Sequence, residues 1–192
     1  MKKIKILSLL FCVVMLVAAC HDDEEGPIIP QPREQVGRTV LVYIVGDNGV
    51  NELSDLFKTN FEDMKEDMKE VDYSKCNLVV YSEMVNDVPR LVSLKKQNGK
   101  VVADTLFTYS EQNPLAKEVM SSVISQTVSY FPADSYGFVF LSHSSSWVPA
   151  TNDANSRSIG YYRRTQMNIP DFHDVLLLSL IHISEPTRQA EI

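Results

Sequence analysis

The residue best suited to chemistry is His143, which stands where an apolar run opens into a loop of small residues (141–149, LSHSSSWVP). An imidazole exchanges protons near neutral pH, so a histidine fixed by a strand yet open to a cleft can act as a general acid and base. Ser144 and the two serines after it leave room for backbone amides to approach a substrate oxygen, as an oxyanion hole requires. A histidine after a strand is also common as a structural residue, and this pattern alone leaves both interpretations open.

Other reactive side chains have weaker support. Asp47 follows another apolar run, within Gly-Asp-Asn-Gly (46–49). It either lines a cleft and contacts a basic group of a substrate, or serves only as a turn or helix-capping residue. Cys76 has no motif around it and is interpreted as structural. The serines after His143 lack the strand–elbow–helix context of a serine hydrolase, and no cluster of metal-ligating residues is visible, so the residues themselves predict no cofactor.

Three segments are predicted to be the buried strands that hold these side chains. Continuous apolar, β-branched runs at 38–45, 77–81 and 136–142 are typical of strands buried on both faces. Parallel strands place functional groups in the loops beyond their carboxyl ends. The predicted site therefore lies in the loops 46–51 and 143–149.

The segments between these strands complete an α/β pattern. Apolar residues at helical spacing indicate a helix over 51–71, and Asn113-Pro114 is expected to open a second helix that ends near residue 130. Asn98-Gly99 predicts a hairpin between strands at 90–94 and 101–107. The order strand, helix, strand, hairpin, helix, strand predicts a three-layer α/β sandwich with a mainly parallel sheet, incomplete at its C-terminal end.

Residues 1–19 resemble a bacterial lipoprotein signal peptide. Three lysines precede an apolar run that is too short to span a bilayer, and the run ends in Val-Ala-Ala-Cys (17–20), which resembles a lipobox. Cys20 is then diacylated and anchors the protein to a membrane; the alternative is an ordinary signal peptide cut after Ala19. The acidic, proline-rich residues 20–37 are expected to form a solvated tether, and their acidic start resembles a surface-export signal. We expect an exported lipoprotein on the outer membrane or cell surface, with the periplasmic face as the alternative.

Residues 178–192 are interpreted as foreign to the protein. The eleven residues 178–188 (LSLIHISEPTR) match a translation of the adapter used in transposase-based sequencing libraries. The apolar run at 175–183 is therefore not taken as a buried strand, although its length would allow it. His182 is excluded as a catalytic candidate for the same reason. The native domain is expected to cover residues 38–177.

Charge and cysteine content exclude some classes of partner. The net charge is −7 and the pI is near 5.1, which argues against nucleic acid and against electrostatic binding to anionic lipid. Because Cys12 lies in the signal peptide and Cys20 is expected to be lipidated, Cys76 has no partner for a disulfide within the domain.

Three stretches carry a family resemblance: 39–48 (TVLVYIVGDN), 130–134 (YFPAD), and 135–143 (SYGFVFLSH) with Trp147 and Pro149. They are similar to the clostripain family of cysteine peptidases over about residues 38–175. The resemblance implies a caspase-like fold in which His143 is the catalytic imidazole and a cysteine after the next strand is the nucleophile. It also implies protein or peptide substrates cleaved after Arg or Lys, with an acidic specificity pocket. Calcium is a possible cofactor by this resemblance alone, since no calcium loop is visible in the sequence.

The sequence departs from the family pattern in two places. Ser144 stands where the family has glycine, and its amide is expected to help form the oxyanion hole. The expected Ala-Cys strand should follow residues 167–172, but the adapter-like segment comes first, and Cys76 precedes the histidine. The chain as given is therefore expected to be inactive. The alternative function is a non-catalytic surface-binding lipoprotein that keeps the fold, and a cysteine in the intact gene would decide between the two.

Three arginines, Arg157, Arg163 and Arg164, lie beyond His143, where self-cleavage would suit an Arg-specific enzyme. We interpret this segment instead as an exposed polar loop.

Overall fold

The computed structural model describes residues 30–49, 51–144 and 158–184 of the chain. Residues Gln31–Ile192 form one compact unit, to which all the described residues except Pro30 belong. The predicted signal peptide and Cys20 lie outside the described residues, as does the adapter-like segment from residue 185 onward. In the part of the chain that is described, no helix is both long enough and apolar enough to cross a membrane.

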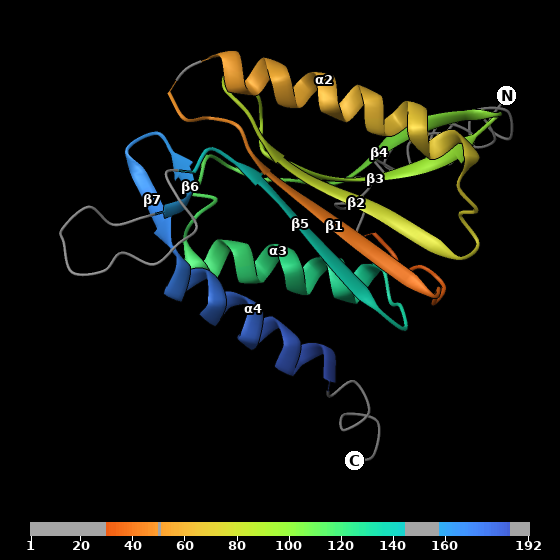
Figure 1. The fold of residues 1–192 in the computed structure, drawn as a ribbon. Helices are drawn as coiled ribbons and strands as arrows, with labels where there is room; N and C mark the ends of the chain where they lie inside the picture. Colours follow the sequence, from red (N-terminus) through yellow and green to blue (C-terminus); the bar gives the residue numbers. More distant parts are fainter. Residues whose placement is uncertain (1–29, 50, 145–157, 185–192) are drawn as a thin grey trace, which may run out of the picture. The chain divides into compact units, whose positions relative to one another are not determined.

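Five strands form the central sheet: β1 (Arg38–Val45), β2 (Cys76–Glu83), β3 (Arg90–Gln97), β4 (Lys100–Thr108) and β5 (Tyr136–Ser142). Their spatial order is β4-β3-β2-β1-β5 (Figure 1). β1 is hydrogen-bonded in parallel to β2 on one side and to β5 on the other, as expected for strands joined by long crossovers. The hairpin of β3 and β4 extends the sheet antiparallel to β2. All three predicted strands and the predicted hairpin are present, and β1 and β2 have the predicted burial at their centres.

Three helices cover the sheet: α2 (Asn51–Asp67), α3 (Lys117–Tyr130) and α4 (Ile169–Ser184). α2 lies on one face, and α3 and α4 lie on the other, so the predicted three layers are present (Figure 1). α2 continues into a short 3-10 turn, Met68–Glu70, which confirms the predicted length of the first helix.

The predicted start of the second helix is wrong by about three residues. Asn113 forms a turn instead of the first helical turn, because its side-chain oxygen accepts the N–H of Leu115 at 3.0 Å. Its main-chain oxygen accepts the N–H of Ala116 at 3.1 Å. α3 therefore begins only at Lys117.

β1 builds the core on both of its faces because its side chains alternate with a period of two. Leu41, Tyr43 and Val45 belong to the core cluster that includes residues of α3. Val42 and Ile44 belong to the other cluster, which lies under α2. A fully buried apolar side chain of this size contributes about 1.5–3 kcal/mol, so β1 is the element around which the two helical layers are fixed.

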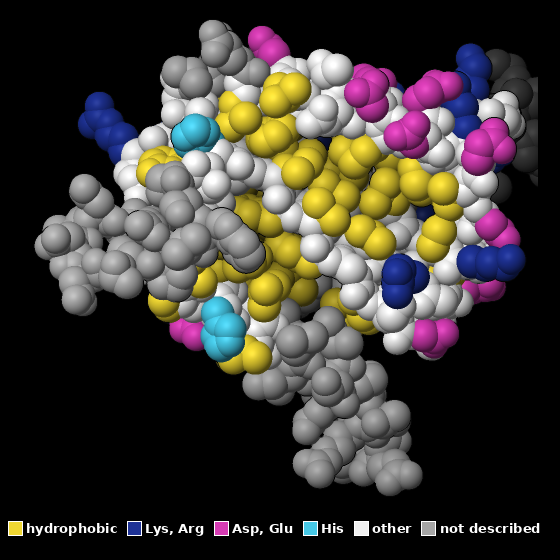
Figure 2. All heavy atoms as spheres, in the orientation of Figure 1, with side chains coloured by type: hydrophobic (Ala, Val, Ile, Leu, Met, Phe, Trp, Pro, Cys, Tyr) yellow, Lys and Arg dark blue, Asp and Glu magenta, His cyan; other side chains and the backbone are white. Residues whose placement is uncertain are grey.

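β5 lies at the edge of the sheet and is less buried than predicted. Val139 is 42% exposed, and the other residues of β5 are only partly buried. Within the described residues, β5 pairs with β1 alone. Figure 2, in the orientation of Figure 1, shows hydrophobic side chains gathered across the face on which β5 lies. An unpaired edge strand of this kind is a template for a further strand.

A small hairpin that the sequence did not predict precedes α4. It consists of β6 (Ser158–Tyr162) and β7 (Thr165–Asn168), which pair antiparallel. α4 then runs without a break through Leu177 and Leu178, so this segment is helical and the rejection of a strand here is confirmed. The foreign origin of residues 178–192 stays a prediction.

Candidate active site

The strand ends bring together the two loops that the sequence analysis singled out. In the parallel pairing of β1 and β5, Val45 lies opposite Ser142. Asp47 and His143 therefore leave neighbouring strands at the same edge of the sheet. Glu83 ends β2 opposite Val45 and adds a third side chain at this edge. A site beyond the carboxyl ends of parallel strands is the usual location in an α/β sheet.

His143 is exposed at the end of β5 and lies beside the β6–β7 hairpin. Its imidazole ring is 5.3 Å from the ring of Tyr161, with the two planes inclined at 62°. The main-chain N–H of Tyr161 donates to the Ser142 hydroxyl at 3.2 Å, which ties β6 to the end of β5. Ser144 is also exposed, and residues 145–157 lie outside the described part of the chain. An exposed imidazole at an open sheet edge leaves room for a substrate and for a group on a neighbouring strand.

Asp47 is buried, with 6% of its surface exposed, and its oxygens are bonded within the fold. One carboxylate oxygen accepts the N–H of Gly49 at 3.1 Å, as in the turn that the sequence allowed. The other accepts the Nε–H of Arg163 at 2.7 Å. The main-chain N–H of Arg163 also donates to the main-chain oxygen of Asp47 at 2.8 Å. Asp47 therefore joins the end of β1 to the β6–β7 hairpin.

Arg163 is exposed in the turn between β6 and β7, as the interpretation of an exposed polar loop expected, but its side chain is also paired within the fold. Its guanidinium pairs with Glu111 as well as with Asp47. The hydrogen bond to Asp47 is the largest cause of a raised pKa of Arg163, and the hydrogen bond to Glu111 is the next largest. The guanidinium therefore keeps its charge. Long-range pairing with β1 was not visible in the sequence because Asp47 and Arg163 are 116 positions apart.

Glu83 is a buried carboxyl group, 3% exposed, at the same edge. Burial, followed by the negative charge of Asp47, raises the pKa of Glu83 to about 7, while Arg163 opposes the shift. One of its carboxyl oxygens has no hydrogen-bond partner among the described residues. Because an unpaired buried carboxylate is costly, Glu83 holds a proton over part of the neutral pH range.

Sequence reasoning missed Glu83 and Tyr161. The rule that selected Asp47, an acidic residue just beyond an apolar strand, also selects Glu83 once β2 is extended past its predicted end at Tyr81. No comparable signal could place Tyr161 against His143. The hairpin that carries Tyr161 is separated from β5 by residues 143–157, which have no periodic pattern.

Cys76 is too far from His143 to act with it. It opens β2 and lies opposite Arg38, at the amino edge of the sheet. Glu83, which ends the same strand, is seven positions further on, or about 23 Å at the usual rise of a strand. The interpretation of Cys76 as a structural residue therefore fits its position.

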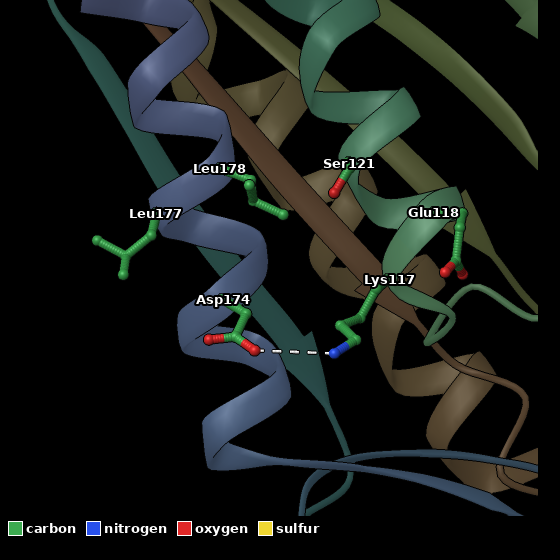
Figure 3. Close-up of a pocket in the computed structure, with 6 residues that line it drawn as sticks. All are labelled: Lys117, Glu118, Ser121, Asp174, Leu177 and Leu178. Atoms are coloured by element: carbon green, nitrogen blue, oxygen red, sulfur yellow. Dashed lines mark ion pairs between the residues drawn. The ribbon is translucent and has the colours of Figure 1, made fainter.

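A pocket between α3 and α4 is distinct from the strand ends (Figure 3). Lys117 ties the two helices through ion pairs with Asp171 at 2.9 Å and Asp174 at 3.7 Å. Leu178 points toward α3, whereas Leu177 points away from it (Figure 3). Among the described side chains, no imidazole or thiol lines this pocket, and no group of His, Cys, Asp and Glu could hold a metal ion.

Comparison with known proteins agrees with this arrangement. The sequence profile of the clostripain family matches residues 42–184. A secreted C11 cysteine protease from Bacteroides thetaiotaomicron, solved in complex with an irreversible peptide inhibitor, is 38% identical with a TM-score of 0.63 over 74% of this chain. A cysteine protease from B. fragilis is 40% identical with a TM-score of 0.54, covering 62% of this chain and 98% of that chain.

An inactive zymogen C11 protease from Parabacteroides distasonis is 33% identical with a TM-score of 0.55, over 62% of this chain and 34% of that chain. This chain spans 39% of the B. thetaiotaomicron relative. No curated protein sequence matches the chain significantly. The similar structures confirm the expected caspase-like fold.

Proposed function

Because this chain belongs to the clostripain family of cysteine peptidases, we propose that it is the N-terminal part of an exported, lipid-anchored cysteine endopeptidase. His143 is the catalytic imidazole, and the nucleophilic cysteine comes from sequence that follows residue 177 in the intact gene. The observation that carries this proposal is the position of His143, which is exposed at the end of a strand whose other edge is unpaired among the described residues. A parallel strand added beside β5 would end next to the imidazole.

The proposed reaction has two halves. A thiolate on the added strand attacks the peptide carbonyl carbon, and the carbon–nitrogen bond breaks as the His143 imidazolium gives its proton to the leaving amine. The neutral imidazole then takes a proton from water as the water attacks the thioester. The carbon–sulfur bond breaks, and the carboxylic acid and the thiolate are released. The N–H of Ser144 is proposed to stabilise the oxyanion that forms in each half.

Negative charge at this edge supports a preference for substrates cleaved after Arg or Lys. Asp47 and Glu111 pair with Arg163, and Glu83 adds a further negative charge once it loses its proton. Asp47 contributes to this charge, but a basic substrate group that binds it directly has to displace Arg163, which already occupies one of its oxygens. We propose that Asp47 acts on basic substrates mainly through the electrostatic field at this edge of the sheet.

The first experiment is to sequence the genomic locus past the codon for Leu177 and to express the intact gene product. A cysteine at the end of the next apolar strand, hydrolysis of peptides after Arg or Lys, and loss of that hydrolysis in His143→Ala support the proposal. We expect the loss to exceed about a hundredfold. His173→Ala is the matched control, because this exposed histidine lies on α4. An intact frame without the cysteine would favour the non-catalytic binding lipoprotein instead.

The role of Ser144 has its own test. Ser144→Pro removes the backbone N–H and should lower kcat about 100- to 1,000-fold, as loss of one oxyanion donor does. Ser144→Gly keeps the N–H and restores the family residue, so it should retain at least the wild-type kcat. Equal activity of the proline and glycine variants would remove Ser144 from the proposed oxyanion hole.

A further inference from the structure

The β6–β7 hairpin is fastened to the sheet at two places on the proposed active-site edge. At the end of β5, the main-chain N–H of Tyr161 donates to the Ser142 hydroxyl at 3.2 Å. At the end of β1, Arg163 binds Asp47 through its main-chain N–H at 2.8 Å and through its Nε–H at 2.7 Å. The hairpin therefore spans the two strands from which His143 and Asp47 emerge.

Arg163 holds this position in a conformation that favours glycine. It occupies the two-residue turn between β6 and β7 with φ of 51°, in the left-handed region. A bulky residue is uncommon there, so its side-chain contacts must compensate for the strain. The guanidinium binds Asp47 and Glu111 and lies 5.0 Å from the centre of the Tyr162 ring. The side chain of Arg163 thus keeps the turn against the sheet.

Gly160 lets the hairpin approach β5 closely. A Cβ atom at this position would lie 2.9 Å from the Phe140 ring and 2.9 Å from a methyl group of Leu115. Such distances are shorter than van der Waals contact, so a larger residue would force β6, the Phe140 ring or the Leu115 side chain to move. The close approach carries the next residue, Tyr161, to the imidazole of His143.

The contact between Tyr161 and His143 has a favourable geometry. The ring centres are 5.3 Å apart and the planes are inclined at 62°, an edge-to-face arrangement. An exposed histidine at a strand end is otherwise free to change rotamer. A ring fixed by the hairpin restricts that freedom and keeps the imidazole where the reacting atoms must meet.

We propose that Tyr161 is a positioning residue for the His143 imidazole, and that Arg163 acts as the latch that holds Tyr161 in place. This inference rests on the proposed catalytic role of His143. Neither residue touches the substrate in this scheme. Their effect is on the fraction of time that the imidazole spends in the reactive orientation.

The test uses the intact gene product and four variants. Tyr161→Leu removes the ring, and Tyr161→Phe keeps it. Arg163→Gln removes the latch, and Arg164→Gln is the matched control, because Arg164 is the exposed neighbour in the same turn. We expect Tyr161→Leu and Arg163→Gln to lower kcat about tenfold or more with KM changed less than about twofold. Tyr161→Phe and Arg164→Gln should stay close to the wild type.

A second measurement does not depend on activity. The carbon-bound imidazole protons of His143, assigned by comparison with His143→Ala, feel the ring current of Tyr161 in the NMR spectrum. These signals should move in Tyr161→Leu and in Arg163→Gln and stay in place in Arg164→Gln. Urea unfolding of each variant identifies any that fails to fold. If Tyr161→Leu fails to fold, the result of Arg163→Gln decides the positioning role, because this change leaves the core untouched.

The outcomes separate this inference from the proposed function. Unchanged imidazole signals in both Tyr161→Leu and Arg163→Gln would overturn the positioning role. A fall in kcat/KM that comes from a higher KM, with kcat unchanged, would also overturn it. A wild-type protein with no hydrolytic activity would refute the peptidase proposal, while the NMR comparison would still decide whether Tyr161 orients His143.

Discussion

Replacing Glu83 with glutamine should stabilise the protein at pH 8 and change it little at pH 5. Glu83 is 3% exposed, one of its carboxyl oxygens lacks a partner among the described residues, and its pKa is raised to about 7. Burial is the main cause, and the charges of Asp47 and Glu111 add to it, whereas Arg163 and an N–H of Asp47 oppose it. Glutamine has nearly the same shape and carries no charge for Asp47 to repel.

The magnitude follows from proton linkage. The ordinary pKa of a glutamate is 4.5, and the folded value is about 7. Between these values the folded state binds more protons than the unfolded state, so the free energy of unfolding falls as the pH rises. For these two pKa values, ionisation of Glu83 costs about 0.8 kcal/mol at pH 5, about 2 kcal/mol at pH 6 and about 3 kcal/mol at pH 7 and above. The Glu83→Gln variant does not pay this cost.

The assay is urea unfolding of the intact gene product and of Glu83→Gln at pH 5, 6, 7 and 8. The difference in unfolding free energy should grow with pH and level off above pH 7, with equal m-values for the two proteins. Glu66→Gln is the control, because Glu66 is 70% exposed in a surface ion pair with Lys69 and should change stability by less than about 1 kcal/mol at every pH. A difference that is constant with pH, or that shrinks as the pH rises, would refute this account of Glu83.

Gly160→Ala should destabilise the intact protein by about 1–3 kcal/mol, because the added methyl group meets Phe140 and Leu115 at 2.9 Å. Urea unfolding measures the change, and a neutral result would show that β6 or these side chains shift without cost. Cys20→Ser should abolish incorporation of labelled palmitate and release the protein from the membrane fraction, unless export uses an ordinary signal peptide. Residues 20–177 expressed alone should aggregate, because β5 has an apolar edge that no described residue pairs with. A monomer in size-exclusion chromatography that also melts cooperatively would contradict this.

Local patterns were enough to predict most strands of the central sheet. β1 and β5 were predicted with the bounds that the structure has, because each is a continuous apolar run with clear turn residues after it. The hairpin at Asn98-Gly99 was equally clear, because Asn and Gly are the residues that a tight turn with positive φ favours, and both have positive φ in the structure. The start of α3 was misplaced because Asn113-Pro114 serves as a turn signal as well as a helix signal.

The candidate site was predictable only in part. The end of β5 pointed to His143, and the end of β1 pointed to Asp47, because the carboxyl ends of parallel strands are where sites form. The exposure of β5 was not predicted, because the burial of an apolar strand depends on whether a neighbour pairs with it. A run of apolar residues looks the same at the centre and at the edge of a sheet.

The sequence by itself determined the α/β order, the central strand β1 and the histidine at a strand end, since each depends on neighbouring residues and their periodicity. Only the tertiary structure decided that Arg163 binds Asp47, that Tyr161 lies against His143, and that Glu83 is buried with a raised pKa. Those properties depend on contacts between residues that are far apart in the chain. Such contacts exist only after the sheet and the hairpin have packed together, and no local pattern encodes them.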